Sequence, residues 1–452
     1  MFERVLVANR GEIAVRVIRA LHELDIEAVA VYSTADREAL HVTLADQAVC
    51  IGPPAAGESY LGISNIVAAA ETTGCTAIHP GYGFLAENAE LVDACVDNNI
   101  VFIGPSAEVM RRLGDKAQAK AEMRAAGVPL VLGTDGAVTL AEARVAALDI
   151  GYPILLKATA GGGGKGMRLV TGPAEIDDAY AAASNEADAA FGNGALYVER
   201  AVVPARHVEI QVLCDTHGNV LTLGERECSI QRRHQKLVEE SPSPALTPET
   251  REAMEAAVER ACRELGYVNA GTFEFLLGTA GEPYFIEVNC RLQVEHPVTE
   301  LVTGIDIVRE QIRVAAGGRL SHMGRATRSG HAIEVRINAE DPARGFAPAP
   351  GTVTRFRPPL GPGVRIDTAM FEGAVITPYY DSLIAKLIVH DDTRAAAIAR
   401  AIRALREFEI EGIPTTRDLA LDVLASREFA SGTYSTSYLE EMEDRLPSLA
   451  PV

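Results

Sequence analysis

The first hundred residues alternate between short apolar runs and an amphipathic segment. Residues 5–9 predict a buried strand, residues 12–24 repeat apolar positions at helical spacing, and residues 27–32 predict a second buried strand. Strand-like segments return within 76–88 and at 100–104. Strand, helix and strand in this order predict a βαβ unit of a doubly wound parallel sheet.

The turn after the first predicted strand argues against a nicotinamide cofactor. It reads Asn9-Arg-Gly-Glu12 and contains one glycine. A dinucleotide-binding turn needs three glycines, so that the pyrophosphate can approach the backbone. The sheet pattern is therefore present without its usual cofactor turn.

A hairpin is predicted further along the chain, where two β-prone runs, 272–277 and 284–289, flank a short polar loop. If Gly278 pairs with Pro283, the register places one glutamate of each run directly opposite the other. Like charges that face each other across a hairpin are destabilising. The pattern therefore needs an explanation beyond strand propensity.

The two facing residues are Glu274 and Glu287, and a divalent cation between them would turn their repulsion into attraction. Asn289 points to the same face and adds an oxygen ligand of the kind that Mg²⁺ accepts. The hairpin therefore predicts a magnesium site at Glu274, Glu287 and Asn289. An edge hairpin with a solvated face is the alternative.

The polar alternation continues beyond the hairpin through Arg291, Gln293 and Glu295. At about 3.3 Å per residue, an extended chain separates Glu287 from Glu295 too far for both to reach one ion. We therefore expect the later residues to line the pocket in which the reaction takes place.

A strand, a glycine loop and a second strand are predicted at 152–170. Residues 161–166 formally match G-x-G-x-x-G, yet residues 167–170 predict a strand where a dinucleotide fold needs a helix. A Walker A loop also fails, because Lys165 is followed by glycine rather than Ser or Thr. The pattern is typical of a flap that lays backbone N–H groups over phosphates, with Lys157 as a fixed positive charge. A plain mobile hairpin is the alternative.

Two other stretches carry positive charge in an acidic chain. Lys116 opens an alanine-rich helix, where the macrodipole disfavours a lysine, and this indicates a nearby anion. Residues 225–236 form a polar and basic block between strand-rich regions, which favours an anion pocket. A solvated lysine and an exposed charged loop are the respective alternatives. Cys228 within the block is interpreted as a packing residue.

The later part of the chain predicts a helix at 253–265 and a domain boundary at 321–330, where the composition loosens. Strand-like segments at 331–338 and 379–389 and a helix at 394–408 predict a smaller α+β domain. The fold class is therefore α/β and α+β, with several domains.

Composition excludes several classes of protein. A length of 452 residues predicts two to four domains, and a net charge of −20 argues against a nucleic-acid or anionic-membrane partner. Seven cysteines without a C-x-x-C pair predict reduced, mostly buried thiols. The N-terminus lacks a signal-peptide pattern, and no apolar run approaches the roughly 20 residues of a membrane span. We expect a cytoplasmic protein.

Six motifs follow one another along nearly the whole chain, at residues 8–14, 79–88, 161–166, 231–236, 287–297 and 336–341. Together they closely resemble biotin carboxylase, the ATP-grasp subunit of biotin-dependent carboxylases such as acetyl-CoA carboxylase. The resemblance implies a Rossmann-like N-terminal domain at 1–115, an ATP-grasp domain at 116–330 with a mobile glycine-rich lid at about 131–203, and a C-terminal domain at 331–452.

Position by position, the resemblance also implies the site residues. ATP would be bound by Lys116, Lys157, Gly163, Gly164, Glu199, Arg200, Val202, His207, Gln231, His234 and Leu276. Magnesium would be held by Glu274, Glu287 and Asn289, the same three that the hairpin selects. Bicarbonate and biotin would be bound by Lys236, Arg291, Gln293, Val294, Arg336, Tyr82 and Gly83. The implied catalytic set is Lys236, Arg291, Arg336, which would stabilise the biotin enolate, and Glu295, which would deprotonate bicarbonate.

The implied cofactors are ATP and two divalent ions, Mg²⁺ with Mn²⁺ as an alternative. Biotin is expected as a substrate on a separate biotin carboxyl carrier protein. The nearest match to the family's Ala-Met-Lys-Met attachment pattern, Glu252-Ala-Met-Glu255, has no lysine, and the chain ends at Val452 without a carrier domain. Carboxyltransferase subunits and a second copy in a homodimer are the other expected partners, although Pro362 stands at a position that is aromatic in some relatives.

The leading hypothesis is ATP-dependent carboxylation of carrier-bound biotin through carboxyphosphate, the first half-reaction of acetyl-CoA carboxylase toward malonyl-CoA and fatty acid synthesis. A subunit of a pyruvate carboxylase or of another acyl-CoA carboxylase is the alternative. Another ATP-grasp ligase would share the hairpin and the flap but does not account for 291–295 together with Arg336. A nucleotide-binding regulatory subunit would have no use for Glu295 as a base.

Overall fold

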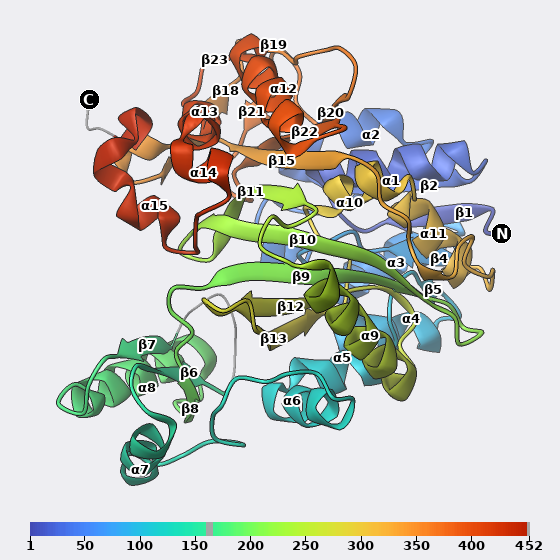
Figure 1. Ribbon diagram of the computed structural model, residues 1–452. Helices are drawn as coiled ribbons and strands as arrows, with labels where there is room; N and C mark the ends of the chain where they lie inside the picture. The colour runs from blue at the N-terminus through green and yellow to red at the C-terminus, as the bar shows by residue number, and fades with distance from the viewer. Residues whose placement is uncertain (160–165, 450–452) are drawn as a thin grey trace.

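The computed structural model describes residues 1–159 and 166–449. One long sheet crosses the middle of the molecule, with the N-terminal region on one side of it and the C-terminal helices above it (Figure 1). A small lid projects from this body at the lower left of the view. The arrangement leaves a cleft between the lid and the other regions, described below.

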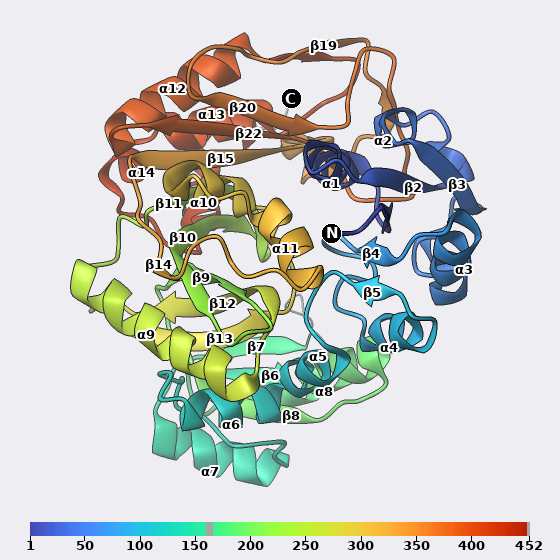
Figure 2. The ribbon, with the colours of Figure 1, turned by 90° about the vertical axis from the view of Figure 1, so that its right-hand side faces the viewer.

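The N-terminal region is the predicted doubly wound parallel sheet, with strand order β3-β2-β1-β4-β5. Figure 2 shows this sheet and its helices on the right. The side chain of Asn9, in the turn after β1, donates to the carbonyl oxygens of Pro80 and Tyr82 at 2.7 Å each, and this brings Tyr82 to the cleft. The elements are β1 (Arg4–Val7), α1 (Gly11–Glu23), β2 (Glu27–Ser33), α2 (Leu40–Leu44), β3 (Gln47–Gly52), α3 (Ile63–Thr73), β4 (Ala77–His79), α4 (Ala89–Asp97), β5 (Val101–Phe102) and α5 (Ala107–Gly114).

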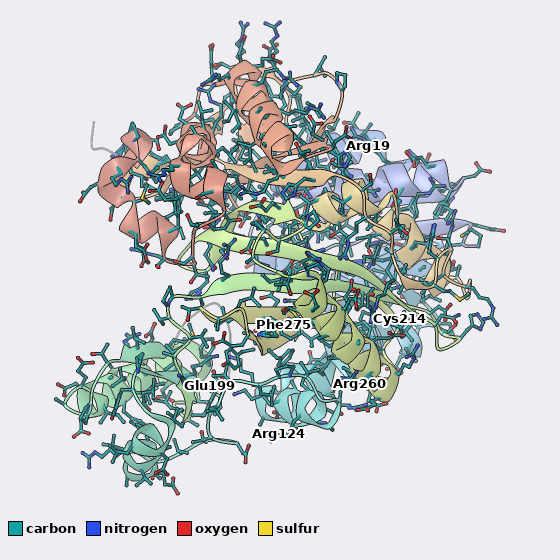
Figure 3. All side chains as sticks on the ribbon, viewed as in Figure 1. Arg19, Arg124, Glu199, Cys214, Arg260 and Phe275 are labelled. Atoms are coloured by element: carbon teal, nitrogen blue, oxygen red, sulfur yellow. The ribbon has the colours of Figure 1, made fainter. Side chains whose placement is uncertain are left out.

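The long central sheet has the order β13-β12-β9-β10-β11-β15-β22-β20, with β14 beside β10. Its strands are β9 (Arg206–Cys214), β10 (Val220–Arg232), β11 (Gln235–Ser241), β12 (Asn269–Leu277), β13 (Pro283–Asn289), β14 (Gly324–Arg325), β15 (His331–Asn338), β20 (Val364–Thr368) and β22 (Leu383–Asp391). Helices α6 (Lys116–Ala125), α9 (Pro248–Leu265), α10 (His296–Thr303) and α11 (Ile307–Ala315) pack around it. In Figure 3, Arg260 lies on α9; its Nε donates to the carbonyl of Ala126 after α6, at 3.2 Å.

This sheet continues across the predicted boundary near residue 330. Strand β15 pairs with β11, and β22 pairs with β15. The long strands of the last region therefore extend the central sheet instead of forming a sheet of their own, which satisfies the backbone groups that an edge at β11 would expose. The remaining elements are the short strands β16 (Glu340–Asp341), β17 (Ala347–Pro348), β18 (Gly351–Thr352), β19 (Arg355–Arg357), β21 (Val375–Ile376) and β23 (Glu409–Glu411), and the helices α12 (Arg394–Glu407), α13 (Arg417–Ala425), α14 (Arg427–Ser431) and α15 (Tyr438–Glu441).

The lid consists of a small antiparallel sheet of order β7-β6-β8, covered by two helices. Its elements are α7 (Leu140–Ile150), β6 (Ile154–Ala158), β7 (Met167–Val170), α8 (Ile176–Phe191) and β8 (Leu196–Arg200). The pairing of β6 with β7 confirms the predicted strand, loop and strand. Gly163 and Gly164 lie outside the described residues. Figure 3 places Glu199 on the side of the lid that faces the main body.

Glu274 and Glu287 face each other across the hairpin, as predicted, but the turn register on which that prediction was based is wrong. The hairpin closes between Leu277 and Pro283, one position away from the expected pairing with Gly278. A register shift directly after Glu274 restores the alignment of the two glutamates. A β-bulge of this kind adds one residue to one strand and re-aims the side chains beside it.

The basic block at 225–236 is not an exposed loop. It occupies β10, the start of β11 and the turn between them, and most of it is buried. Arg226 is fully buried and donates to Glu209 Oε1 at 2.5 Å, Gln211 Oε1 at 2.8 Å and Thr299 Oγ1 at 2.9 Å. Arg226 can be internal because it finds partners on neighbouring elements, whereas Arg233 at the turn is exposed.

The structure bears on two predictions from composition. Six of the seven cysteines are buried and Cys50 is exposed, all as free thiols, as predicted. Within 1–159 and 166–449, no helix is both long enough and apolar enough to cross a membrane.

Candidate active site

A deep cleft of about 1360 Å³ lies where the lid, the central sheet and both terminal regions meet. Its lining brings together most of the predicted site residues. These are Tyr82, Gly83, Lys116, Lys157, Val202, His207, Gln231, His234, Lys236, Glu274, Leu276, Glu287, Asn289, Arg291, Gln293, Val294, Glu295 and Arg336. Glu199 reaches the cleft through the lysines that it binds, and Arg200 is exposed at the end of β8.

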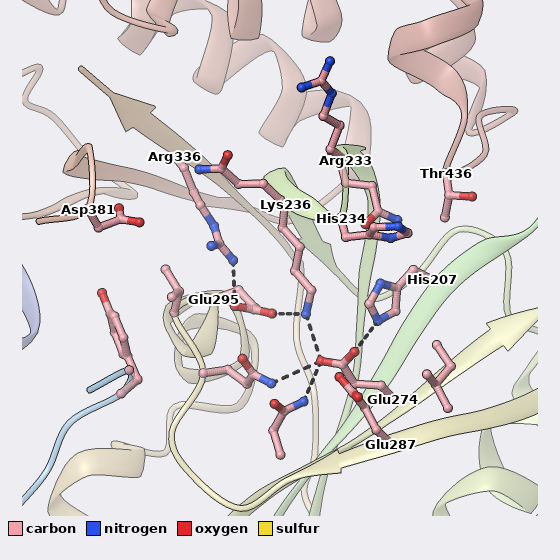
Figure 4. Close-up of a pocket in the computed structure, with 18 of the residues that line it drawn as sticks. His207, Arg233, His234, Lys236, Glu274, Glu287, Glu295, Arg336, Asp381 and Thr436 are labelled. Carbon is pink, nitrogen blue, oxygen red and sulfur yellow. Dashed lines mark hydrogen bonds and ion pairs between the residues drawn. The ribbon is translucent and has the colours of Figure 1, made fainter. Parts of the chain in front are cut away.

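Glu274 on β12 is the centre of a polar cluster on the cleft floor (Figure 4). Its Oε1 accepts hydrogen bonds from Asn289 Nδ2 at 2.8 Å, Lys236 Nζ at 3.2 Å and Gln293 Nε2 at 3.3 Å. Its Oε2 lies 2.9 Å from His207 Nε2. Burial alone would raise the pKa of Glu274, but Lys236 and His207 outweigh it and hold the pKa far below its ordinary value. Glu274 is therefore a permanent anion.

Glu287 on β13 faces Glu274, and its pKa is shifted in the opposite direction. Burial and the charge of Glu274 raise the pKa of Glu287, and Lys116 and Lys157 offset only part of this. The two carboxylates and the Asn289 amide form an all-oxygen donor set, the kind that Mg²⁺ prefers. A divalent cation would remove the repulsion that raises the pKa of Glu287, so the residues present fit the predicted ion.

The segment 290–295 corrects one inference from the sequence. It is not a continuation of β13, which ends at Asn289. Because the chain turns there, Gln293 returns to within hydrogen-bonding distance of Glu274, and Lys236 contacts both Glu274 and Glu295. The separation calculated for an extended chain does not apply, and the residues predicted to hold magnesium lie directly beside those predicted to bind bicarbonate.

Glu295 is held between two cations. Lys236 Nζ lies 2.5 Å from its Oε1, and Arg336 Nη2 lies 2.8 Å from its Oε2. Burial opposes ionisation, but Lys236 and Arg336 keep the pKa of Glu295 well below its ordinary value. The group is a fixed carboxylate with both oxygens oriented, as a proton acceptor in this cleft needs to be.

Arg291 borders this pair. Its Nε donates to Glu87 Oε2 at 2.7 Å, and its Nη groups donate to Gln293 Oε1 and Asn289 Oδ1 at 2.9 Å each. Two of these partners are predicted site residues, so Arg291 connects Asn289 of the predicted magnesium set with Gln293 of the predicted bicarbonate set.

Lysines gather where the lid meets the main body. Lys157 Nζ lies 2.8 Å from Glu199 Oε2, and Lys120 binds the other oxygen of Glu199 while its Nζ lies 4.0 Å from the centroid of the Tyr197 ring. Burial and the nearby Lys157 lower the pKa of Lys116. Cations gathered in this way are the arrangement expected of a polyphosphate site.

Three residues that the sequence analysis did not select belong to this network. Lys120 stands four residues after Lys116, on the same helix face. Glu209 stands two residues after His207, on the same strand face, and accepts from Lys236 at 2.6 Å. Lys386 is a charged residue flanked on both sides by apolar residues in strand β22. Lys120 and Glu209 could have been found by extending the periodicity of an element already recognised, whereas the contact of Lys386 with Val294 has no such signal.

Glu239 leads to a prediction about pH. It accepts from Arg336 Nε at 2.6 Å, and burial raises its pKa to about 7 despite that arginine. Because the folded protein keeps a proton that the unfolded chain has released, stability falls as pH rises toward 7. Relative to Glu239→Gln, the wild type should lose about 2 kcal/mol of unfolding free energy between about pH 5.5 and pH 8. Urea unfolding at both pH values tests this, and equal changes in the two proteins would contradict it.

Comparison with known proteins covers nearly the whole chain. Residues 1–110 match the model of the biotin carboxylase N-terminal domain, 115–323 that of the carbamoyl-phosphate synthase L chain ATP-binding domain, and 334–441 that of the biotin carboxylase C-terminal domain. The biotin carboxylase of a Nostoc species is 54% identical over 443 residues, covering 98% of this chain and 99% of the relative. The chain belongs to the biotin carboxylase family.

Solved biotin carboxylase structures have the same fold. A Campylobacter jejuni biotin carboxylase in a β,γ-ATP complex superimposes with a TM-score of 0.95 at 46% identity, covering 98% of this chain and 99% of that one. The biotin carboxylase domain of the Hydrogenobacter thermophilus 2-oxoglutarate carboxylase, a dimer with MgADP, ADP and bicarbonate, gives a TM-score of 0.94 at 50% identity, covering 98% of each chain. The predicted family and fold class are confirmed.

The family assignment also decides between the enzyme classes considered. The ATP-binding match is shared with carbamoyl-phosphate synthase, which explains why another ATP-grasp ligase fits the hairpin and the flap. The flanking domains are those of biotin carboxylase. The chain is therefore an ATP-dependent ligase of this family, and not a regulatory subunit.

Proposed function

We propose that this biotin carboxylase uses ATP and bicarbonate to carboxylate biotin carried on a separate protein, as the first half-reaction of acetyl-CoA carboxylase. The observation that carries the proposal is the position of Glu295, clamped by Lys236 and Arg336 directly beside the acidic pair Glu274 and Glu287. A proton acceptor next to a metal site and a cluster of lysines suits the activation of a small oxyanion by a nucleotide.

In this proposal the lysines bind and orient ATP. Lys116, Lys157 and His207 neutralise the phosphates, while Gln231, His234 and Leu276 line the nucleoside end, with Val202 and the backbone at Glu199 and Arg200. Mg²⁺, or Mn²⁺ in its place, would be held by Glu274, Glu287 and Asn289, and when bound it stabilises negative charge on the transferring phosphoryl group. The bound MgADP of the Hydrogenobacter relative supports a magnesium-dependent nucleotide site in this chain.

Bicarbonate would lie against Lys236, Arg291, Gln293 and the Val294 backbone, where Glu295 can accept its proton. Entry of an anion draws Lys236 away from Glu295, which raises the pKa of this carboxylate and strengthens it as a base. The deprotonated bicarbonate attacks the γ-phosphorus of ATP, the bond to the β,γ-bridging oxygen breaks, ADP leaves and carboxyphosphate forms. Lid closure, with the glycine loop over the phosphates, would exclude water from this intermediate.

Carboxyphosphate then releases CO₂ and phosphate, and the phosphate removes the ureido proton of biotin. Arg336 would stabilise the resulting enolate, with Tyr82 and Gly83 beside it, and the enolate nitrogen attacks CO₂. The guanidinium is suited to this because its pKa is raised: burial lowers it, but Glu239 and Glu295 outweigh that effect. It stays charged throughout the cycle.

The proposal includes partners and organisation. A biotin carboxyl carrier protein would bring the substrate, and carboxyltransferase subunits would complete the reaction in the cytoplasm. The dimer of the Hydrogenobacter relative supports a homodimer. We propose domain limits at 1–115, 116–330 and 331–452, with the lid at about 131–203.

The final acceptor of the carboxyl group separates the proposal from its alternative, a subunit of a pyruvate carboxylase or of another acyl-CoA carboxylase. One relative is the biotin carboxylase domain of a 2-oxoglutarate carboxylase, so a 2-oxo acid is also a candidate for the final acceptor. Labelled bicarbonate should first appear on the biotin of the carrier protein. Transfer to acetyl-CoA by the organism's carboxyltransferase supports the proposal, and transfer to pyruvate alone supports the alternative.

A further inference from the structure

Lys386 is a buried charge that the mechanism above does not use. It lies in β22 with no exposed surface, and the residues around it in the strand are apolar. Its Nζ donates to the backbone carbonyl of Val294 at 2.9 Å and lies 3.1 Å from Glu12 Oε1 and 3.9 Å from Asp367 Oδ2. Burying an ammonium group is costly unless it is paired and hydrogen-bonded. The contacts of Lys386 therefore indicate its role.

The two carboxylates do not account for Lys386 by themselves. Asp367 already receives two hydrogen bonds from Arg365, at 2.8 and 2.7 Å. Glu12 also accepts from the hydroxyl of Tyr82, a residue of the cleft wall. Both acids keep a donor without the lysine. The contact that distinguishes Lys386 is its hydrogen bond to the Val294 carbonyl.

That carbonyl belongs to a segment that lies outside any helix or strand. Residues 290–295 carry Arg291, Gln293, Val294 and Glu295, yet they lie between β13 and α10 and belong to neither. At the start of the segment, the Cys290 amide donates to Glu87 Oε1 at 2.8 Å. Near its end, Lys386 holds Val294. The segment is thus fastened by an N-terminal residue at one end and a C-terminal residue at the other.

Fixing the Val294 carbonyl also fixes what lies on either side of it. The peptide unit is planar, so the orientation of this carbonyl sets the direction in which Glu295 leaves the backbone. The Val294 N–H, which in the proposed function faces bicarbonate, belongs to the preceding peptide unit and is joined to this carbonyl through the Val294 Cα. An error of about 1 Å in such a segment is enough to impair a reaction about 100-fold.

We propose that Lys386 is a positioning residue for bicarbonate: it orients the 293–295 backbone from beneath the cleft and links that backbone to the Glu12–Tyr82 wall. The proposal rests on the proposed function, because it assigns a role in binding that function's substrate. Lys386 contacts none of the residues assigned to ATP, so we expect its removal to leave the KM for ATP unchanged.

The test compares three variants of the full-length protein by steady-state phosphate release. Lys386→Met keeps the volume and removes the donor, Lys386→Gln keeps a shorter neutral donor, and Asp367→Asn alters the same charge cluster without touching Val294. Leaving a buried carbonyl without its donor should raise the KM for bicarbonate about 10-fold or more in Lys386→Met. We expect a smaller rise in Lys386→Gln, and KM values for ATP within about 2-fold of wild type in all three.

Several outcomes would overturn the proposal. These are an unchanged KM for bicarbonate in Lys386→Met, parallel changes in the KM values for ATP and bicarbonate, and equal effects of Lys386→Gln and Asp367→Asn. If Lys386→Met does not unfold cooperatively, Lys386→Gln alone is used for the test. Its KM for bicarbonate should then rise while its KM for ATP stays near the wild-type value. Absence of biotin-stimulated turnover in the wild type would instead refute the proposed function, so the two failures are distinguishable.

Discussion

Glu295→Gln is expected to lower biotin-dependent ATP turnover by about 10²–10⁴-fold, the contribution of a positioned general base. Glutamine keeps the shape, but its amide has a single acceptor oxygen, so it can accept from either Lys236 or Arg336, whose nitrogens lie 2.5 and 2.8 Å from the two carboxylate oxygens, and not from both. It cannot take a proton from bicarbonate. ATP binding should persist, because the lysines around Glu199 do not contact this residue. Turnover and ATP affinity, measured separately, test the expectation.

A matched control is Glu255→Gln. Glu255 is also a buried glutamate beside an arginine, with Arg328 Nη1 at 3.5 Å, but it lies on α9 outside the cleft. Its replacement should leave turnover within about 2-fold of wild type. Near-normal biotin-dependent turnover in Glu295→Gln would remove this residue from the role of base.

The second large effect is expected from Glu287→Gln. Losing a carboxylate ligand should weaken Mg²⁺ binding by at least about 100-fold, since even outer-shell changes cost 10–100-fold. The same change removes the like charge that faces Glu274, so the variant without metal should be as stable as the wild type or more stable. Reduced activity without reduced stability separates a metal ligand from a structural residue.

The Mg²⁺ dependence of turnover and the thermal unfolding midpoint in chelator measure these two effects. Glu282→Gln is the control, because it removes a carboxylate from the loop of the same hairpin, outside the cleft. If Glu287→Gln turned over ATP at the same Mg²⁺ concentration as the wild type, the assignment of the metal site would be wrong.

Sequence patterns correctly predicted the parts of the fold and site that depend on residues close together in the sequence. The βαβ order of the N-terminal sheet and the facing of Glu274 and Glu287 follow from periodicities of 3.6 and 2. Glu274 and Glu287 face each other although the predicted turn register was wrong, because a bulge after Glu274 shifts the pairing back by one residue. That compensation depends on the backbone geometry of both strands, which their composition does not record.

The features that were missed depend on partners distant in sequence. The sequence favoured an anion pocket at 225–236 but did not indicate that Arg226 of this block is buried against Glu209 and Thr299. The return of Gln293 to Glu274 requires the chain to turn after β13, where no proline or glycine marks the turn. Nothing in β22 indicates that Lys386 lies under Val294, 92 residues away. Such contacts are set by the packing of the three regions and not by any one segment.

The measurement that tests the central claim most directly is phosphate release from MgATP by the purified wild-type protein, with bicarbonate and free biotin each present or omitted. The account predicts stimulation only when both are present, because Glu295 acts on bicarbonate and Arg336 acts on biotin in the same cleft. ATP hydrolysis that is indifferent to biotin would contradict it.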